Sequence, residues 1–347
     1  MRLAFVACAT LGVALVAPVP TTTARADGAP RHRLRLATVA PDGTHWAREL
    51  RAFAREIADA THDEVEVKWV FGGIAGTEEE VRARIGRDQL DGAASGGPLC
   101  QAVSPTFRVL TMRGIFQTRD EAAHVMTRLK PTLDEEFGRA GFRFIGSTAL
   151  GPEMAWLRRE VRTFDELRRT RLWMWSDDPP HIAVSRDIGF TVVGTPIPEA
   201  QRRYEAGDFD GFITTPTALI AYQWVPVVKA VIALPLSFDW GCLVVTSRAF
   251  DRLPVEARDA VLAAAAKTAA RINAAGQRDD ERLLDPTPGG LLARSGVRVI
   301  APTEVMRAQF LAAARAARER MSAEALSPER LREVQSLLAD YRAEHAR

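Results

Sequence analysis

The sequence predicts an α/β protein built from two lobes. Strand and helix patterns alternate between residues 33 and 85, and the same alternation resumes from residue 118. About 320 residues remain after a removable N-terminus, enough for two lobes with separate cores. No second apolar stretch of membrane length follows in the sequence, so we expect a soluble protein.

The N-terminal segment, residues 1–26, has the pattern of a cleaved secretory signal peptide. A short basic start precedes the almost continuously apolar residues 3–16, and Ala24-Arg25-Ala26 is a small-x-small cleavage signal. The apolar run of about 14 residues is shorter than the roughly 20 that a bilayer helix needs, which disfavours a transmembrane anchor. We therefore expect export to the periplasm, with a mature chain that starts near Asp27.

The first elements follow from hydrophobic periodicity and helix capping. Residues 33–39 alternate as a strand, and residues 65–69 form the next strand. Thr77 and Glu80 form a capping box that opens a second helix. The first helix, between the two strands, carries its apolar side chains on one face: Trp46, Leu50, Phe53 and Ile57.

The same pattern continues along the chain. Capping boxes that begin at Thr118 and Thr163 open two further helices. Residues 254–284 form one long helical segment without an internal proline, and two polar-faced helices end the chain. Further strands are predicted at residues 141–145, 171–175, 242–246 and 297–300.

Two similar segments of the sequence predict a ligand site. Residues 88–95 and 208–215 each end a helix at Asp-Gly and enter a short strand, which delivers Ser95 in one copy and Thr214 and Thr215 in the other. In open α/β sheets, ligands bind outside the carboxyl ends of strands. Two such half-sites facing each other would form an interlobe cleft. The alternative is that Asp-Gly is only a common turn.

Aromatic residues gather near the same predicted strand ends. Trp173 and Trp175 flank Met174, so both point to the same side of their strand, and Phe212 and Trp240 lie near the second half-site. Ligand clefts are typically apolar with a few placed polar groups. Each aromatic residue could instead pack in the core or between lobes, but we expect the set to contribute to the cleft.

Composition and motifs disfavour several functions. The formal charge of +2 falls to about 0 once the signal peptide is removed, so nucleic acid is not an expected partner. The six histidines lack metal-ligand spacing, and residues 72–76 lack the ending of a phosphate-binding loop. Ser95 resembles a nucleophile elbow, but alanine stands at position 93 where that motif requires glycine. We therefore expect no catalytic residues, no metal and no cofactor.

Two cysteines remain in the predicted mature chain, Cys100 and Cys242. An oxidising compartment would permit a disulfide, but the sequence does not show that the two thiols meet. Of the two possibilities we favour unpaired, buried thiols.

In order and spacing, several of these segments resemble the DctP family of receptors for tripartite ATP-independent periplasmic (TRAP) transporters. The resemblance covers essentially the whole mature chain, and each motif alone is weak. The matching segments are residues 34–38, 86–92, 164–167, 171–173, 207–211 and 243–247, followed by Leu253-Pro254 and the long helix. The resemblance implies a two-lobed, type II periplasmic-binding-protein-like fold with mixed sheets flanked by helices and a long helix spanning both lobes. Lobe I is predicted to comprise residues 27–149 and 237–276, and lobe II residues 150–236 and 277–347.

The resemblance also implies a function. A member of this family is a periplasmic receptor, not an enzyme, that encloses a small organic ligand by hinge closure and delivers it to a TRAP membrane permease. One alternative is a periplasmic sensing module for a signalling or accessory protein, and another is an enzyme on a binding-protein fold. We expect a monomer.

Two positions depart from the acid-binding members of the family. Those members place one arginine on the strand after the Asp-Glu-Leu turn and another after the preceding strand, where this chain has Trp173 and Glu153. The usual carboxylate clamp is therefore expected to be missing, unless Arg171 or Arg158 replaces it. We expect instead a ligand with a large apolar part, hydroxylated or amine-bearing. Its expected contacts are Ser95, Glu153, Trp173, Trp175, Phe212, Thr214, Thr215 and Trp240.

Overall fold

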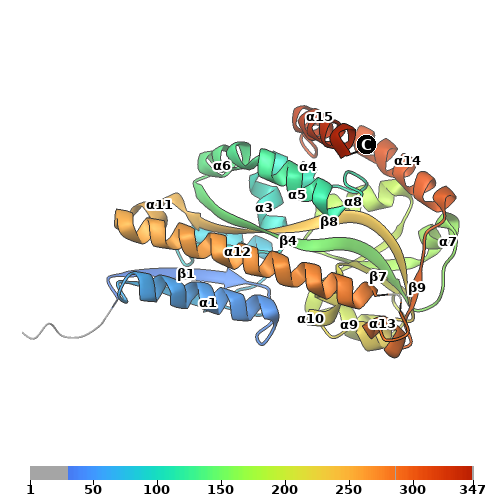
Figure 1. Ribbon diagram of the computed structural model, residues 1–347, viewed down its shortest axis with the longest axis horizontal. Coiled ribbons are helices and arrows are strands. Elements are labelled where there is room, and N and C mark those ends of the chain that lie inside the picture. The colour runs from blue at the N-terminus through green and yellow to red at the C-terminus, as the bar shows by residue number, and fades with distance from the viewer. Residues whose placement is uncertain (1–29, 286, 346–347) are drawn as a thin grey trace, which may run out of the picture.

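The computed structural model describes residues 30–285 and 287–345, so the predicted signal peptide lies outside the described residues. Its central feature is a mixed sheet (Figure 1). The sheet has nine strands in the order β2-β1-β3-β8-β4-β7-β5-β6, and β9 pairs with β8. The strands are β1 (His32–Thr38), β2 (Val65–Val70), β3 (Gly92–Ser95), β4 (Phe142–Leu157), β5 (Arg171–Trp175), β6 (Thr191–Thr195), β7 (Gly211–Thr214), β8 (Ala230–Thr246) and β9 (Arg298–Ile300).

Two long antiparallel strands, β4 and β8, join the two ends of this sheet. Their pairing runs from Phe142 opposite Thr246 to Leu157 opposite Ala230. The parallel strands β1, β2 and β3 form a first strand group, which is attached through β3 to β8. The parallel strands β5, β6 and β7 form a second strand group, which is attached through β7 to β4. The predicted α/β class is confirmed, and the two groups belong to one continuous sheet.

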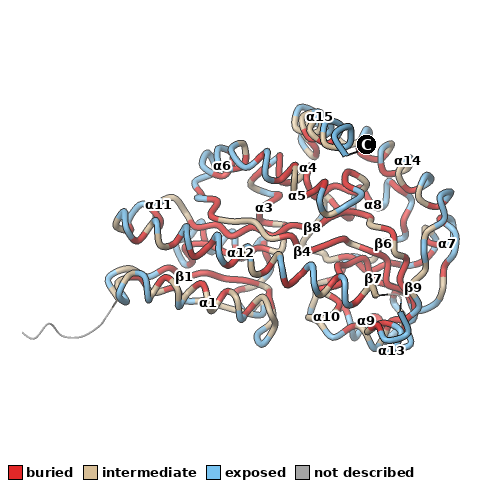
Figure 2. Tube along the Cα trace, in the orientation of Figure 1, coloured by how far each residue is buried: buried red, intermediate tan, exposed pale blue. Residues whose placement is uncertain are grey.

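Helices cover both faces of the sheet, and its long strands β4 and β8 are buried over most of their length (Figure 2). The predicted capping box at Thr77 is confirmed. At Thr118 and Thr163 the hydroxyl caps the helix as predicted, but the glutamate accepts from the backbone N–H of the residue before the cap, so the box itself is not formed. The helices are α1 (His45–Ala60), α2 (Glu78–Gly86), α3 (Pro98–Val103), α4 (Pro105–Thr111), α5 (Arg119–Arg128), α6 (Lys130–Arg139), α7 (Phe164–Arg169), α8 (Pro179–Ile188), α9 (Ile197–Glu205), α10 (Pro216–Ala221), the 3₁₀ turn η1 (Val225–Val227), α11 (Ser247–Asp251), α12 (Val255–Leu284), α13 (Leu291–Arg294), α14 (Glu304–Arg320) and α15 (Pro328–His345).

The long helix α12 spans 30 residues and crosses the molecule in front of β4 (Figure 1). It packs against α1 at one end and against α10 and α13 towards the other, so it contacts elements beside both strand groups. This confirms the predicted long helix. In the described part of the chain, no helix has both the length and the apolar character needed to cross a membrane.

The two C-terminal helices lie over different parts of the molecule. Helix α14 packs against α7 and α8, whereas α15 packs against α4 and α5. Arg342 of α15 forms an ion pair with the buried Glu121 of α5, with Nε 2.7 Å from Oε1. The last helix therefore rests on elements of the predicted lobe I, although residues 277–347 were assigned to lobe II. The lobe boundaries stay a prediction.

Cys100 and Cys242 form a disulfide, so the expectation of two unpaired thiols is wrong. The strand register explains the contact, because β3 places Ser95 opposite Cys242 on β8. Helix α3 then begins at Pro98 and carries Cys100 back over that position, with the two Cα atoms 6.0 Å apart. The two cysteines are 142 residues apart in sequence, and only the sheet pairing brings them together.

Replacing both cysteines with alanine is expected to lower the free energy of unfolding by about 2–5 kcal/mol, because the disulfide closes a long loop and restricts the unfolded chain. Urea unfolding with and without reductant measures this. Reductant should shift the wild-type midpoint towards that of the double variant and leave the variant unchanged. An equal response of both proteins to reductant would contradict the assignment.

Candidate functional site

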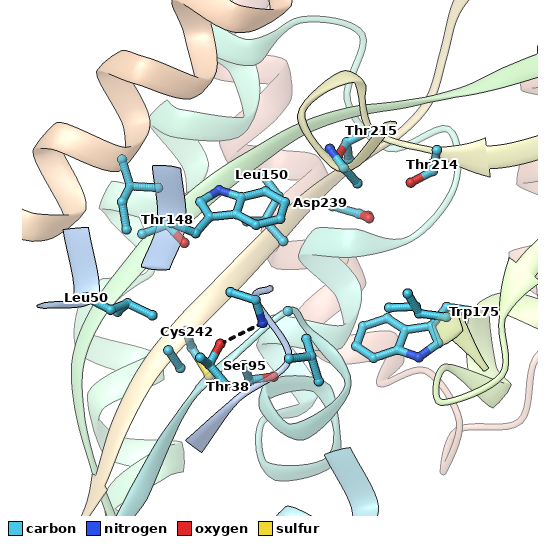
Figure 3. A pocket seen from close by; sticks show the side chains of 18 of the residues that line it. Thr38, Leu50, Ser95, Thr148, Leu150, Trp175, Thr214, Thr215, Asp239 and Cys242 are labelled. Carbon is cyan, nitrogen blue, oxygen red and sulfur yellow. Dashed lines mark hydrogen bonds between the residues drawn. The ribbon is translucent and has the colours of Figure 1, made fainter. Parts of the chain in front are cut away.

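A large cavity lies between the two strand groups. It contains about 1080 Å³ of empty space, including the part open to solvent. Its wall receives Thr38 from the end of β1 and Ser95 from the end of β3, and Thr214 and Thr215 from the end of β7 (Figure 3). Helix α12 supplies part of another side through Ile272 and neighbouring small residues. The carboxyl ends of strands from both groups therefore meet at one cavity, where ligands bind in open α/β sheets.

The two Asp-Gly segments are built alike. The carboxylate of Asp91 accepts a hydrogen bond from Nε of Arg35 at 2.9 Å, and that of Asp210 accepts one from Nε of Arg171 at 2.9 Å. Each aspartate stands directly before the glycine that begins β3 or β7, and a Cβ at either glycine would collide with a backbone oxygen of the neighbouring long strand. The similar segments 88–95 and 208–215 thus begin two equivalent strands, and the ends of these strands place Ser95 and Thr214 in the wall of the same cavity.

The cavity wall is rich in aromatic side chains. Trp173 and Trp175 both line it. Trp173 is only 3% exposed, and its indole N–H has no acceptor among the described residues. Three further aromatic residues, which were not among the expected ligand contacts, complete the wall: Trp46, Tyr222 and Trp224.

Two of the predicted contact residues lie elsewhere. Phe212 is fully buried and does not line the cavity, because Trp224 stacks on its ring with centroids 4.6 Å apart and covers it. Trp240 lines a smaller neighbouring cavity of about 380 Å³. The other six predicted residues, Ser95, Glu153, Trp173, Trp175, Thr214 and Thr215, line the large cavity.

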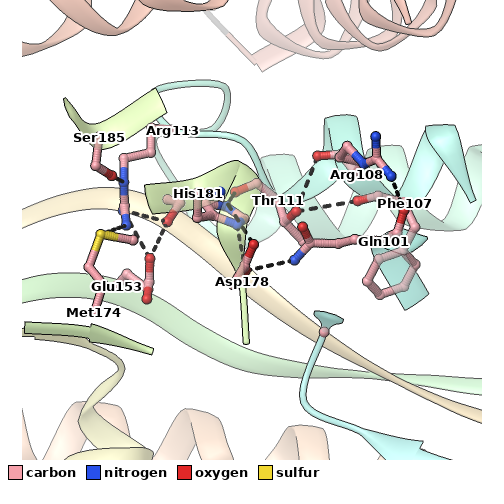
Figure 4. A network of polar contacts seen from close by, with 12 residues as sticks. Gln101, Phe107, Arg108, Thr111, Arg113, Glu153, Met174, Asp178, His181 and Ser185 are labelled. Carbon is pink, nitrogen blue, oxygen red and sulfur yellow. Dashed lines mark hydrogen bonds and ion pairs between the residues drawn. The ribbon is translucent and has the colours of Figure 1, made fainter. Parts of the chain in front are cut away.

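Glu153 reaches the cavity already paired with a buried arginine. Nη1 of Arg113 lies 2.9 Å from Oε2 of Glu153, and the hydroxyl of Ser237 donates to the same oxygen (Figure 4). Arg113 has no exposed surface, and it also donates to Ser185, to Ser237 and to the sulfur of Met174. The sequence analysis missed Arg113. Its signal was a single arginine within the apolar stretch from Val109 to Phe116.

The two arginines considered as substitutes for the clamp are held elsewhere. Arg171 is committed to Asp210, and Arg158 donates to the carbonyl of Tyr204 and lies 4.0 Å from the centre of its ring. Over residues 30–285 and 287–345, no arginine or lysine lines the large cavity. Its ionisable side chains there are the carboxyls of Glu153 and Asp239 and the phenol of Tyr222.

A second polar network connects α8 with α3 and α4. Nδ1 of His181 lies 2.7 Å from Oδ2 of Asp178, and Nε2 lies 2.7 Å from the carbonyl oxygen of Thr111 (Figure 4). Gln101 donates to the same carboxylate at 3.0 Å. Burial alone would lower the pKa of His181, but the charge and hydrogen bond of Asp178 outweigh it and raise the pKa to about 9. An imidazolium at neutral pH donates to both partners. No group of three or more metal-ligating side chains occurs in the described ranges.

Comparisons with known proteins agree on one family. The family model described as "Bacterial extracellular solute-binding protein, family 7" (DctP) matches residues 36–325. No curated protein matches the chain.

Similar solved structures include three receptors. One is the Bordetella pertussis extracytoplasmic solute receptor DctP7, which binds pyroglutamic acid (19% identity, 88% of this chain and 99% of that one, TM-score 0.77). Another is a TRAP periplasmic solute binding protein from Desulfovibrio desulfuricans with bound sn-glycerol-3-phosphate (15% identity, 89% and 97%, TM-score 0.80). A third, from Haemophilus influenzae RdAW, has bound L-gulonate (16% identity, 89% and 99%, TM-score 0.79). At these identities the similarity shows the fold.

Replacing His181 with alanine is expected to lower the free energy of unfolding by about 3–5 kcal/mol near pH 6, because Asp178 would stay buried without its cation. The folded-state pKa of about 9 lies above the ordinary value of 6.5. The stabilisation is therefore complete below about pH 6.5 and is lost as the pH rises through about 9. Urea unfolding of wild type and His181→Ala from about pH 6 to 9.5 checks this. The difference between their free energies of unfolding should become smaller as the pH rises.

The double variant Asp178→Asn/His181→Ala provides the control. It removes the buried charge together with its partner and should recover part of the lost stability. If the difference in free energy of unfolding between wild type and His181→Ala stays constant with pH, His181 and Asp178 do not form a charged pair.

Proposed function

The chain belongs to family 7 of the bacterial extracellular solute-binding proteins, the DctP family, and we propose that its ligand is a small organic molecule with a large apolar part. Members of this family are periplasmic receptors of TRAP transporters and not enzymes. The observation that carries the proposal is the aromatic cavity between the two strand groups, which both half-sites reach.

The wall chemistry supports this class of ligand. Trp173 and Trp175 offer flat apolar surface, and Ser95, Thr214 and Thr215 offer hydroxyls for a few oriented hydrogen bonds. The similar receptors hold pyroglutamic acid, sn-glycerol-3-phosphate and L-gulonate. A carboxylate enclosed here would face no arginine or lysine from the described residues, and an unpaired buried charge costs several kcal/mol. We therefore propose that this receptor lacks the carboxylate clamp of acid-binding members.

Contacts between the two sides of the cavity support enclosure of the ligand by closure. Asp177, just after β5, accepts the backbone N–H of Glu78 at the start of α2 at 3.0 Å, and Asp178 accepts from Gln101. These residues come from opposite strand groups. Closure that forms them would expel water from the cavity, and the ligand's preference for the closed form would set how far the population shifts.

The remaining parts of the proposal concern the location of the protein, its oligomeric state and its transport partner. We propose that the chain is exported with cleavage near Ala26, acts as a monomer, and delivers its ligand to a TRAP membrane permease. The signal-peptide pattern of residues 1–26 supports export, and the family supports the permease.

A thermal-shift screen of the exported protein tests the proposal. One panel holds small mono- and dicarboxylates, and the other holds apolar, aromatic and amine-bearing metabolites. Because a ligand that binds only the folded state raises the unfolding midpoint, compounds of the second panel should raise it. Stabilisation by simple carboxylates alone would contradict the proposed ligand class.

Replacing Trp175 with alanine is expected to weaken binding of a hit from the second panel by about 10- to 100-fold, because the ligand loses one aromatic wall. Titration calorimetry measures the dissociation constants. Trp69 on β2 packs against Phe53 and Phe71 and does not line the cavity, so Trp69→Ala is the matched control. Equal losses of affinity in both variants would place the ligand outside this cavity.

A further inference from the structure

The large cavity and the smaller one beside it share a wall that contains two carboxyl groups. The shared residues are Gly96, Glu153, Trp175 and Asp239. Asp239 lies on β8 opposite Gly151 of β4, and its carboxyl points into the space between the half-sites (Figure 3). A molecule in the large cavity that extends towards the smaller one must therefore pass Asp239 and the ring of Trp175.

Two other carboxyls around this wall are paired with cations of the protein. Arg113 holds Glu153, and His181 holds Asp178. Asp239 forms no ion pair and no side-chain hydrogen bond with any residue that the structure describes. Of these three carboxyls, Asp239 lines both cavities without a cation of the protein beside it. Glu78, which accepts the backbone N–H of Gly96 at 3.0 Å, also forms no ion pair with a described residue but lies outside both cavity walls. Asp239 is partly exposed to the cavity, so a carboxylate there favours a positive group that comes from outside the chain.

We propose that the ligand carries an ammonium group and that Asp239 binds it, while the apolar body of the ligand lies against Trp173 and Trp175. The inference rests on the proposed function and assigns a charge to the ligand of that same cavity. An ammonium beside Asp239 would form a charge-assisted hydrogen bond, and Trp175 in the same wall offers an aromatic ring of the kind that attracts cations.

The electrostatics of the wall favour a cation over an anion. Burial, together with the nearby charge of Glu153, raises the pKa of Asp239 well above its usual range, against the opposing effects of His181 and Arg113. A ligand cation would relieve this penalty, whereas a ligand carboxylate would add a third negative charge to the wall. Arg113 is fully buried, lines neither cavity, and its charge is already engaged by Glu153.

The rival possibility is a neutral ligand. A protonated Asp239 could donate a hydrogen bond to a ligand hydroxyl and need no cation. The two possibilities differ in how the affinity depends on the ligand's charge at constant shape, so matched ligands can separate them.

Calorimetric titration of the full exported receptor with matched triplets tests the proposal. Each triplet is a primary amine, an alcohol and a carboxylate on one skeleton: 3-phenylpropyl, cyclohexylpropyl or straight-chain hexyl. For skeletons that bind, the amine should bind at least about tenfold tighter than the alcohol, and the carboxylate weakest. In Asp239→Asn, the amine should lose about tenfold or more in affinity while the alcohol is unchanged. Retained alcohol binding shows that this variant is folded.

Asp259→Asn is the matched control, because it removes the same charge from an exposed position on α12 outside the cavity. It should leave every affinity unchanged. Tighter binding of the alcohol or the carboxylate than of the amine would overturn the ammonium assignment and leave the receptor function standing. An unchanged amine affinity in Asp239→Asn would overturn it equally. Failure of every compound in these triplets and in both screening panels would remove the proposed ligand class, and the ammonium assignment would fall with it.

Discussion

The pairing of the two long strands, β4 and β8, is the constraint on which the rest of the molecule depends. Each strand continues from one strand group into the other, so the two groups face each other across a fixed ladder. The ladder is interrupted by register shifts near Gly146, Gly151 and Ala155, beside the cavity. Such irregularities bend a strand and re-aim its side chains, and β4 contributes Thr148, Leu150 and Glu153 to the cavity wall.

The electrostatic character of the cavity follows from the ion pairs that the nearby cationic side chains already form within the protein. Arg113 and His181 lie close to the cavity, but each is bound to a carboxylate of the protein itself. A buried cation that is already paired offers little to an incoming anion. The similar receptors hold pyroglutamic acid, sn-glycerol-3-phosphate and L-gulonate on the same fold, so ligand class follows from a few side chains around a common frame.

Local patterns in the sequence were sufficient for most of the fold and for part of the site. The helix starts at Thr77, Thr118 and Thr163 depend on contacts between residues three positions apart. The half-sites follow from two Asp-Gly turns. The Cys100–Cys242 bond and the role of Arg113 could not be predicted in this way. Both depend on which strand pairs with which and in what register, and that information lies in contacts between residues far apart in sequence, such as Arg113 with Ser237.

The disulfide makes the two sides of the cavity unequal. It ties α3, which follows Ser95, to Cys242 on β8, so the first half-site is covalently fastened to the long-strand pair. Thr214 and Thr215 have no such bond and are attached through backbone hydrogen bonds and packing. The half-site with Ser95 is therefore the more strongly constrained of the two, because its attachment to the long-strand pair includes a covalent bond.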